Sequence, residues 1–413
     1  MVNTVPHVQK QLPLISLHDT PLEACPHITT KGPHSAPLLP NSREVPKLHF
    51  SHPSPAVPHE DGLGIMGQHG STFPPLMGHL PSPAQTPNLE DKVTLEEVGN
   101  DKGQEQKKSV DQSILLCCKF FISEARNIAT LDAVERAARL NPESVIVNKF
   151  HDRAYNRARY TLVSYVLHDC TGNAIYSPLQ QTVVAMAEAA FNAINLELHD
   201  GAHPRLGAVD DIVFHPLGRA SLDEAAWLAK AVAADIGNRF NVPVFLYAAA
   251  HPSGKELDMI RRELGYYRPN FMGNQWAGWN MSDVLPQNPD EGPRIVSRAK
   301  GISMIGARPW VTLYNIPILS TDVSAARRIA RKVSARGGGL PTVQTLGLVH
   351  GEDSTEIACM LLEPNQIGVD KVQNRVEMLA AKEGLDVEEG YFTDFSPEMI
   401  VEEYMNLISA RRS

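Results

Sequence analysis

The chain has 413 residues, of which 43% are hydrophobic and 21% charged, so it is long enough to bury a sizeable core and to form more than one domain. Its formal net charge of −9 at pH 7 argues against a nucleic-acid-binding surface, and no block of Lys and Arg stands alone to predict a membrane partner. No apolar run approaches the roughly 18 residues that a membrane-spanning helix needs.

The cysteines and the N-terminus bear on the compartment. The five cysteines include no Cys-x-x-Cys pair, and Cys117 and Cys118 are adjacent within an apolar run, which is typical of reduced, buried thiols. The N-terminus has no charged region followed by a long apolar core, so it does not resemble a secretory signal. We therefore expect a cytoplasmic protein, with organelle targeting by the N-terminal segment as the open alternative.

Residues 1–112 differ in composition from the rest of the chain. They hold about half of the prolines and more than half of the histidines, and no hydrophobic period persists in them. Such a segment cannot bury enough apolar surface to offset the entropy of ordering it, which predicts a disordered extension that ends in a charged linker over residues 91–109. The irregular spacing of its histidines argues against a metal-binding tract, and its scarcity of arginine argues against a transit peptide.

From residue 113 onward, apolar runs alternate with amphipathic stretches. Ser221 and Glu224 have the spacing of a capping box, which marks the start of a helix. The expected elements of this part are strands over residues 114–122, 145–150, 159–167 and 242–250, and helices over residues 129–140, 177–196 and 221–238.

The C-terminal part repeats this alternation. Thr321 is expected to cap a helix whose apolar residues share one face, and Pro397 to lie in the first turn of the final helix. The other expected elements are strands over residues 309–319, 345–349, 356–363 and 387–395, and a helix over residues 369–379. Both parts have the order β-α-β-β-α-β, which in the first part runs from Ile114 through Phe214 and is followed by a helix and a strand. This order predicts an α/β (α+β) fold of two ferredoxin-like subdomains, residues 113–308 and 309–413, with a ligand cleft between their sheets.

The rigid polar loop HDGAHPRLGAVD, residues 199–210, is the strongest candidate for chemistry. His203 carries a side chain whose ordinary pKa of about 6.5 lets it take and release a proton near neutral pH. Arg205 has the guanidinium geometry to hold a substrate carboxylate, and Asp210 is placed either to orient an imidazole or to close a turn. A histidine that only stabilises a tight loop is the alternative, which the crowding of Gly, Pro and Arg in this turn weakens.

A metal site is a further alternative for this loop. His199 and His203 have the i, i+4 spacing that places two imidazoles on one face of a helix, with His215 and nearby aspartates as additional ligands. Gly201 and Pro204 break a helix at this point, so the two imidazoles are not held on one face. We therefore expect no metal.

The same loop resembles the H-x-G-x-H-P-R-x-G-x-x-D signature of the glutamate formiminotransferase family, whose transferase domain occurs alone or fused to a cyclodeaminase. Further similarity lies in "AYNRARYTLVSYV", in "NPDEGPRIVSRAKGISMIGARPWVTLYNIPILST" and in "VQTLGL". The resemblance covers residues 113–404, with no cyclodeaminase domain expected in this chain. It implies two α/β subdomains whose sheets face each other across a substrate tunnel, and a homodimer.

The resemblance also implies an activity. Members of the family move a formimino group from N-formiminoglutamate to N5 of tetrahydrofolate, and some handle a 5-formyl group. The expected partners are small folate and glutamate derivatives, with tetrahydrofolate as the carrier substrate and no metal. His203 matches the family's catalytic histidine, which moves a proton between the folate nitrogen and the departing amine. The residues expected to support it are Arg205, Asp210, Asn156, Arg157 and Glu124.

Two stretches match the folate-binding segments of the family. In the first, Arg and Lys side chains suit the carboxylates of folate, with a solvated charge cluster as the alternative interpretation. In the second, glycines let backbone N–H groups approach a flat ligand, with a flexible loop as the alternative. The residues implied are Gly292, Pro293, Arg294, Arg298, Lys300 and Gly301 in the first stretch, and Gly338, Gly339, Val343, Gln344 and Gly347 in the second.

The chain departs from the family pattern at the expected catalytic set. Asn148 and Phe150 stand where the family has two active-site Asp residues, and an apolar ring cannot polarise an imidazole. His151 and Asp152 are candidate substitutes, although neighbouring residues of a strand point to opposite faces. A catalytically impaired folate-binding or regulatory protein is therefore the alternative function.

Overall fold

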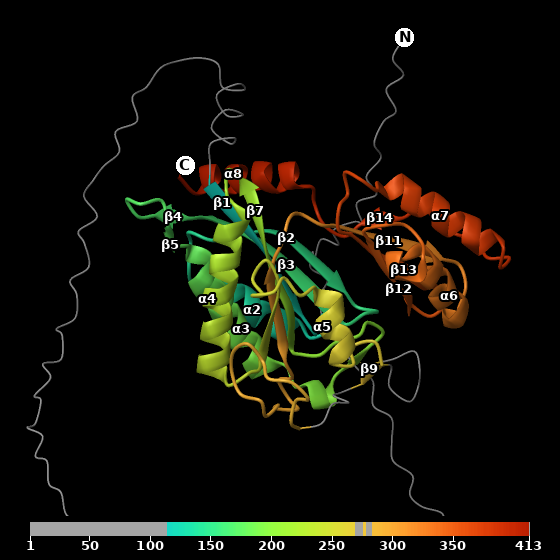
Figure 1. The fold of residues 1–413 in the computed structure, drawn as a ribbon, viewed down its shortest axis with the longest axis horizontal. Coiled ribbons are helices and arrows are strands. Elements are labelled where there is room, and N and C mark those ends of the chain that lie inside the picture. The colour runs from blue at the N-terminus through green and yellow to red at the C-terminus, as the bar shows by residue number, and fades with distance from the viewer. Residues whose placement is uncertain (1–113, 269–275, 278–282, 413) are drawn as a thin grey trace, which may run out of the picture. The chain divides into compact units, whose positions relative to one another are not determined.

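The computed structural model describes residues 114–268, 276–277 and 283–412, which belong to one unit of the chain, Val93–Ser413 (Figure 1). The disordered extension predicted for residues 1–112 lies outside the described residues. None of the helices described is both long and apolar enough to cross a membrane.

The first subdomain is built on one six-stranded sheet. Its main elements in chain order are β1 (Ile114–Ile122), α2 (Ile128–Arg139), β2 (Val145–Asp152), β3 (Arg157–Tyr165), α3 (Pro178–Ala193), β7 (Val209–Gly218), α4 (Leu222–Phe240), β8 (Val244–Ala248) and β10 (Ser303–Ala307). The strand order is β2-β3-β1-β7-β10-β8, with antiparallel pairing from β2 to β7 and parallel pairing of β10 with β7 and β8. The first four strands and α2 and α3 form a ferredoxin-like unit.

The second subdomain repeats this topology on a four-stranded sheet. Its elements are β11 (Thr312–Ile318), α6 (Val323–Val333), β12 (Val343–Val349), β13 (Thr355–Leu361), α7 (Val369–Ala381) and β14 (Tyr391–Phe392), followed by α8 (Pro397–Arg412). The strand order is β12-β13-β11-β14, the ferredoxin-like order again. The predicted α/β fold with two ferredoxin-like subdomains is therefore confirmed.

Short elements lie between the main helices and strands within each subdomain. They are the hairpin of β4 (Leu167–His168) and β5 (Ala174–Tyr176), the pair of β6 (Asp200–Gly201) and β9 (Trp276–Ala277), the helix α5 (Leu257–Glu263), and the 3₁₀ turns η1 (Leu196–Leu198) and η2 (Ala335–Gly337). Since β6 and the loop after it carry the polar signature, this region leads directly into β7.

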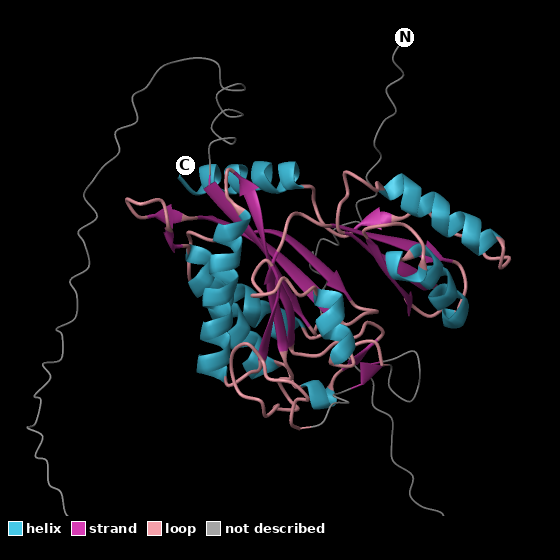
Figure 2. Cartoon of the chain, viewed as in Figure 1, coloured by secondary structure: helices cyan, strands magenta, loops and turns pink. Residues whose placement is uncertain are grey.

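The two-residue period of β1 divides its side chains between two cores. Leu116, Phe120 and Ile122 point to the face covered by α2, α3 and α4 (Figure 2). Leu115 and Cys117 point to the other face and pack with residues of α8. The last helix of the second subdomain, α8, therefore packs on the second face of the first sheet.

The capping prediction is confirmed at one helix and wrong at another. Ser221 accepts from the Glu224 backbone N–H, and Glu224 accepts from the Ser221 backbone N–H, so α4 begins with the predicted capping box. Asp322, not Thr321, caps α6, because its Oδ1 accepts from two backbone N–H groups of the first turn at 2.9 and 3.0 Å.

Three other local expectations differ from the structure. The strand expected over residues 387–395 is reduced to β14, because before it only Val387 bridges to Ile318. β10 was not predicted; it is short and contains Gly306, over which the ring of Tyr247 packs so closely that a Cβ would lie 2.4 Å from it. Cys117 and Cys118 are buried free thiols as expected, whereas Cys170 is exposed.

Candidate functional site

A cavity of about 150 Å³ is lined by side chains of both sheets. From the first subdomain come residues of β1, β2, β3 and β7, and from the second come residues of β11, β12 and β13. The lining is mixed, with aromatic rings, three arginines and two carboxylates. Its residues are Phe121, Phe150, Asp152, Tyr155, Arg157, Ala158, Arg159, His203, Asp211, Arg261, Tyr266, Leu313, Asn315, Gln344, Thr345, Leu346, Ala358, Cys359, Met360 and Thr393.

His203 lies on this cavity, in the loop between β6 and β7. Its Nδ1 is 2.8 Å from the carbonyl oxygen of Pro204, so Nδ1–H donates and Nε2 keeps its lone pair. Its ring meets Tyr155 edge to face, with centroids 5.3 Å apart. Burial, and then the positive charge of Arg157, hold the pKa of His203 well below its usual value. The imidazole is therefore neutral near pH 7, with the Nε2 lone pair available to a group in the cavity.

Arg205 holds this loop instead of facing the cavity. Its guanidinium donates to the carbonyl oxygens of His203 at 2.7 Å and of Tyr155 at 3.1 Å. Gly201 lets it approach, since a Cβ there would lie 2.3 Å from the Tyr155 oxygen and 2.4 Å from the guanidinium. Nε and Nη2 of Arg205 thus bond to backbone carbonyls, whereas its buried Nη1 has no hydrogen-bond partner, and the binding of a substrate carboxylate by Arg205 stays a prediction.

Asp210 closes a turn and holds Arg157. Its Oδ1 accepts from the Leu206 N–H at 2.7 Å, and its Oδ2 lies 2.6 Å from Arg157 and 3.5 Å from Arg261. These positive charges outweigh burial and lower the pKa of Asp210. Of the two roles considered for Asp210, turn closure is the one found, and no bond to His203 is present among its described contacts. Arg157 lies on the cavity.

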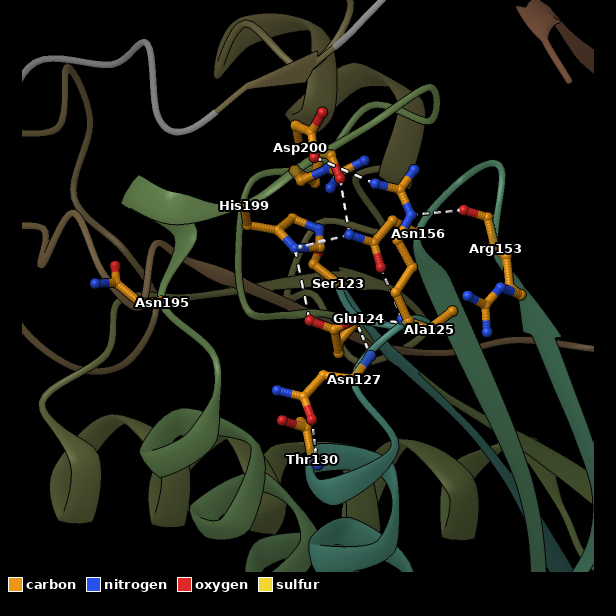
Figure 3. Close-up of polar contacts among 12 residues, drawn as sticks. Ser123, Glu124, Ala125, Asn127, Thr130, Arg153, Asn156, Asn195, His199 and Asp200 are labelled. Atoms are coloured by element: carbon orange, nitrogen blue, oxygen red, sulfur yellow. Dashed lines mark hydrogen bonds and ion pairs between the residues drawn. The ribbon is translucent and has the colours of Figure 1, made fainter. Parts of the chain in front are cut away.

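Asn156 and Glu124 lie beside His199 and Asp200, at the start of the polar loop (Figure 3). Asn156 has a positive φ of 49°; its Oδ1 accepts from the Ala125 N–H at 2.9 Å, and its Nδ2 donates to the Asp200 carbonyl at 2.8 Å and to His199 Nδ1 at 3.1 Å. Glu124 accepts from the backbone N–H of Asn127 at 2.9 Å, at the start of α2. Both residues therefore position backbone and neither lines the cavity.

The two positions that depart from the family pattern lie on the cavity side of β2. Asn148 donates to Asp394 at 3.0 Å, and Asp394 also pairs with Arg159 at 3.2 Å. Phe150 lines the cavity, with the Arg159 guanidinium 5.6 Å from its ring centroid. The chain thus places an apolar wall and an Asn–Asp pair where the resemblance led us to expect two aspartates.

Sequence reasoning missed a polar cluster, which we call the interface cluster: Asp152, Tyr155, Asn315, His350, Glu356 and Tyr391. His350 Nε2 lies 3.0 Å from Asp152 Oδ2, and its Nδ1 lies 3.9 Å from Glu356 Oε1. Glu356 accepts from Asn315 at 2.9 Å, from Tyr391 at 2.6 Å and from the Tyr155 hydroxyl. Its members come from four strands and from two loops, β2–β3 and β12–β13, so no spacing in the sequence indicates the cluster.

Charge and burial act on this cluster in opposite directions. Burial disfavours a charged His350, but the hydrogen bond to Asp152 and the negative charge of Glu356 outweigh it and raise the pKa of His350. Burial also raises the pKa of Glu356. The hydrogen bonds that hold the cluster together have donors and acceptors from both subdomains.

The structure does not gather the metal ligands that were considered in the loop. His199 Nδ1 accepts from Asn156, His203 Nδ1 donates to Pro204, and His215 Nδ1 donates to the Arg308 carbonyl at 3.0 Å. Within the described residues, the three side chains with metal-ligand atoms within 4.8 Å of one another are those of Asp152, His350 and Glu356.

The first expected folate stretch lies away from the cavity, and its role in folate binding stays a prediction. Its polar side chains are used locally: Arg294 donates to the Leu285 carbonyl at 2.9 Å, Arg298 pairs with Asp283 at 2.9 Å, and Lys300 donates to the Phe240 carbonyl at 3.1 Å. Its glycines serve close packing, since a Cβ on Gly292 or Gly301 would lie 2.3 or 2.2 Å from a backbone oxygen. With Pro293, none of these residues lines the cavity.

The second expected folate stretch contributes one of its named residues to the cavity, Gln344. Val343 is a core residue of the second subdomain, and Gly347 lets β12 lie against α6, because a Cβ would meet the Ala326 backbone at 2.4 Å. Gly338 and Gly339 form the turn after η2. Gly339 and Gly347 therefore serve close packing of the chain, whereas a Cβ on Gly338 would meet nothing within 4 Å, and contact of these glycines with a flat ligand stays a prediction.

The fold and the cavity define a two-subdomain α/β protein with a neutral imidazole on a cavity of about 150 Å³ between two ferredoxin-like sheets. The family model of the formiminotransferase domain, N-terminal subdomain, matches residues 115–308. The chain belongs to the formiminotransferase family.

Three relatives illustrate the range of similarity. The formiminotransferase cyclodeaminase-like protein of Arabidopsis thaliana is 50% identical over 298 residues, 72% of this chain and 99% of that protein. The glutamate formimidoyltransferase of Thermoplasma acidophilum is 28% identical over 51% of this chain and 68% of its own length. The formimidoyltransferase-cyclodeaminase of Rattus norvegicus is 31% identical over 58% of this chain and 41% of its own length.

Proposed function

We propose that the chain is a folate-dependent transferase that moves a formimino or formyl group between glutamate and N5 of tetrahydrofolate within this cavity. The observation that carries the proposal is His203, whose Nδ1–H is bound to Pro204 while Nε2 stays free on the cavity. A neutral imidazole in this state accepts a proton without first losing one. The printed names of the relatives, which include glutamate formimidoyltransferase, support the same reaction class.

The proton balance of the reaction suits one such group. N5 of tetrahydrofolate attacks the amidine carbon of the donor, and the C–N bond to glutamate then breaks. The attacking nitrogen loses a proton, which His203 Nε2 accepts, and the departing glutamate nitrogen needs one, which the imidazolium returns. The net change is transfer of the one-carbon unit with no oxidation or reduction.

The rest of the lining provides binding groups for the two substrates. Aromatic rings such as Tyr266 and Phe150 offer flat apolar walls for a pterin. Arg157 and Arg261 lie on the cavity beside His203 and suit anionic carboxylates, and Gln344 offers an amide from the opposite sheet. Asn156, Glu124, Arg205 and Asp210 act on this site by holding the backbone around it.

The test is turnover of the full chain with tetrahydrofolate and N-formiminoglutamate, and with the corresponding formyl compounds. We expect product formation with the wild-type chain and a loss of about 100-fold or more in His203→Ala, since general acid–base catalysis contributes about 10²–10⁴-fold. No turnover in folded wild-type protein, or unchanged turnover in His203→Ala, contradicts the proposal.

A second candidate function is folate binding without turnover, which Phe150 and Asn148 favour because they replace the expected carboxylates. Calorimetric titration with tetrahydrofolate separates the two. Tight binding without turnover supports the binding protein, and absence of binding contradicts both functions.

We further infer that the protein is a cytoplasmic homodimer. It takes small folate and glutamate derivatives and needs no metal. Its domain limits are residues 1–112, 113–308 and 309–413. Light scattering of the purified chain tests the dimer, and subcellular fractionation tests the compartment. Limited proteolysis tests the limits, with first cleavage expected before residue 113. Turnover that disappears with a chelator contradicts the metal-free assignment.

A further inference from the structure

Asp152 places a carboxylate on the same face of β2 as Phe150. Side chains two residues apart on a strand share a face, and both of these line the cavity. His151, between them, lies on the other face, with its ring 5.6 Å from the ring of Tyr160. Of the two residues considered as substitutes for the missing aspartate, Asp152 alone faces the cavity, about 7 Å along the strand from Phe150.

The charges on the cavity are paired in a way that leaves Asp152 distinct. Two carboxylates are among the lining residues within the described part of the chain, Asp152 and Asp211. Asp211 lies 3.4 Å from Arg261 and accepts from the Tyr247 hydroxyl at 2.9 Å. The ion partner of Asp152 is the half-buried His350.

The three cavity arginines are also paired with carboxylates other than Asp152. Arg157 pairs with Asp210 at 2.6 Å, and Arg159 pairs with Asp394 at 3.2 Å. Arg261 lies within 3.5 Å of both Asp210 and Asp211. Asp152 is thus a cavity carboxylate that pairs with no arginine among the described residues, and its ion partner His350 occupies one of its two oxygens.

The interface cluster fixes the direction of this carboxylate. Oδ1 of Asp152 accepts from the Tyr155 N–H at 2.8 Å, and Oδ2 accepts from His350 Nε2 at 3.0 Å. Each oxygen keeps a further lone pair for a ligand. The Tyr155 ring lies between two imidazoles, 5.3 Å from that of His203 and 5.0 Å from that of His350, so Asp152 and His203 are held by one shared residue.

The ligand group that fits a rigid carboxylate near a base is a planar cation with several N–H donors. The amidinium of a formimino donor has this form, with positive charge and N–H groups able to bond both oxygens of a carboxylate. A formyl group of the same size is neutral and presents an acceptor oxygen in that place, against which a carboxylate is repulsive. The two donor types therefore differ most at this position.

We propose that Asp152, positioned by His350, binds the amidinium group of a formimino donor and selects it over the neutral formyl analogue. The proposal rests on the transferase function above and names the one-carbon donor of that site. Asp152 contacts the donor, and His350 acts through Asp152.

Calorimetric titration of the full chain with N-formiminoglutamate and with N-formylglutamate, without folate, tests this selection. We expect the wild-type chain to bind the formimino compound at least about tenfold more tightly, and Asp152→Asn to reduce that ratio at least about tenfold. Asn keeps an Oδ1 to accept from the Tyr155 N–H, so the fold is expected to survive, which circular dichroism checks. A ratio that stays the same in Asp152→Asn overturns the proposal.

His350 is tested by a pair of variants. His350→Ala is expected to lower the formimino-to-formyl ratio, and His350→Gln to restore part of it, because the Gln amide can donate to Asp152. A merely structural role would weaken both ligands equally and leave the ratio unchanged, which overturns the assignment. Glu352→Gln is the control, since Glu352 is exposed in the same hairpin and its loss of charge is expected to leave the ratio unchanged.

Failure of the selection and failure of the transferase function give different results. A wild-type chain that turns over formyl and formimino donors with equal binding overturns the role of Asp152 and leaves the transferase function standing. A wild-type chain that binds neither donor and shows no turnover overturns both. Preference for the formyl donor overturns the proposal as well.

Discussion

The Tyr155 hydroxyl donates a hydrogen bond to the Glu356 carboxylate, 201 residues further along the chain. This bond joins the loop before β3 in the first subdomain to β13 in the second, and both groups are buried. The loop that carries Tyr155 also supplies a carbonyl to Arg205, which in turn holds the backbone of His203. The position of the second sheet is therefore coupled to the geometry around the imidazole.

Removing this hydroxyl is expected to destabilise the protein. In Tyr155→Phe, Glu356 keeps its bonds to Tyr391 and Asn315 but loses one donor, and a lost hydrogen bond to a buried charged group costs about 1.5–3 kcal/mol. Urea unfolding measures the difference. Tyr165→Phe is the matched control, because its hydroxyl donates to Glu143 at an exposed site and its loss is expected to cost under about 1 kcal/mol. Equal effects of the two variants contradict the prediction.

Stability is expected to fall as the pH drops below about 6.5, because buried histidines stay neutral in the folded chain. Burial lowers the pKa of His199 and of His215 to about 3. The unfolded chain takes up these protons near pH 6.5, so stability is complete above that pH and is lost as the pH falls toward 3. Each such histidine contributes a slope of about 1.4 kcal/mol per pH unit in this window.

Unfolding curves at pH 6.5, 5.5 and 4.5 measure this slope. His215→Asn removes one of the histidines with a lowered pKa, so its stability is expected to fall less steeply with acid than that of the wild-type chain. Carboxylates with ordinary pKa values titrate mainly below this window. An equal dependence of stability on pH in the wild-type chain and in His215→Asn contradicts the prediction.

The pH dependence of turnover is expected to respond to Arg157. Its positive charge, after burial, is the next contribution that lowers the pKa of His203. Removing that charge in Arg157→Gln raises the pKa of His203, so the acid limb of kcat/KM moves to higher pH. Profiles from pH 4.5 to 8 provide the measurement, with Arg153→Gln, an exposed arginine in the loop before β3, as the control. A limb that stays in place or moves to lower pH rules the coupling out.

Gly201 is expected to tolerate no side chain. A Cβ there would overlap the Tyr155 carbonyl oxygen and the Arg205 guanidinium, so Gly201→Ala displaces the loop that holds His203. Overpacking of this kind costs about 1–3 kcal/mol, and turnover is expected to fall together with stability. Gly368→Ala is the control, since nothing lies within 4 Å of a Cβ at that position. The midpoint of thermal unfolding measures the stability of both variants. An unchanged midpoint in Gly201→Ala would be inconsistent with this packing.

Much of the fold was predictable because its determinants are local. The alternating side chains of β1, the capping box of Ser221 and Glu224, and the apolar faces of α6 and α7 depend on residues within a few positions of each other. The loop around His203 was recognisable for the same reason, since Gly, His, Pro and Arg stand close together in the chain. β10 was not predicted because five residues that include a glycine show too little hydrophobic periodicity.

The composition of the cavity was decided by tertiary structure alone. Arg294, Arg298 and Lys300 have the chemistry of a ligand site in sequence, yet Arg294 and Lys300 donate to backbone carbonyls, Arg298 pairs with Asp283, and none of the three lines the cavity. Asp152 and His350 had no recognisable spacing, yet they meet at 3.0 Å, because the packing of one sheet against the other brings together strands nearly 200 residues apart. Local periodicity is set by near neighbours, whereas which side chains share a cavity depends on contacts that only the assembled sheets create.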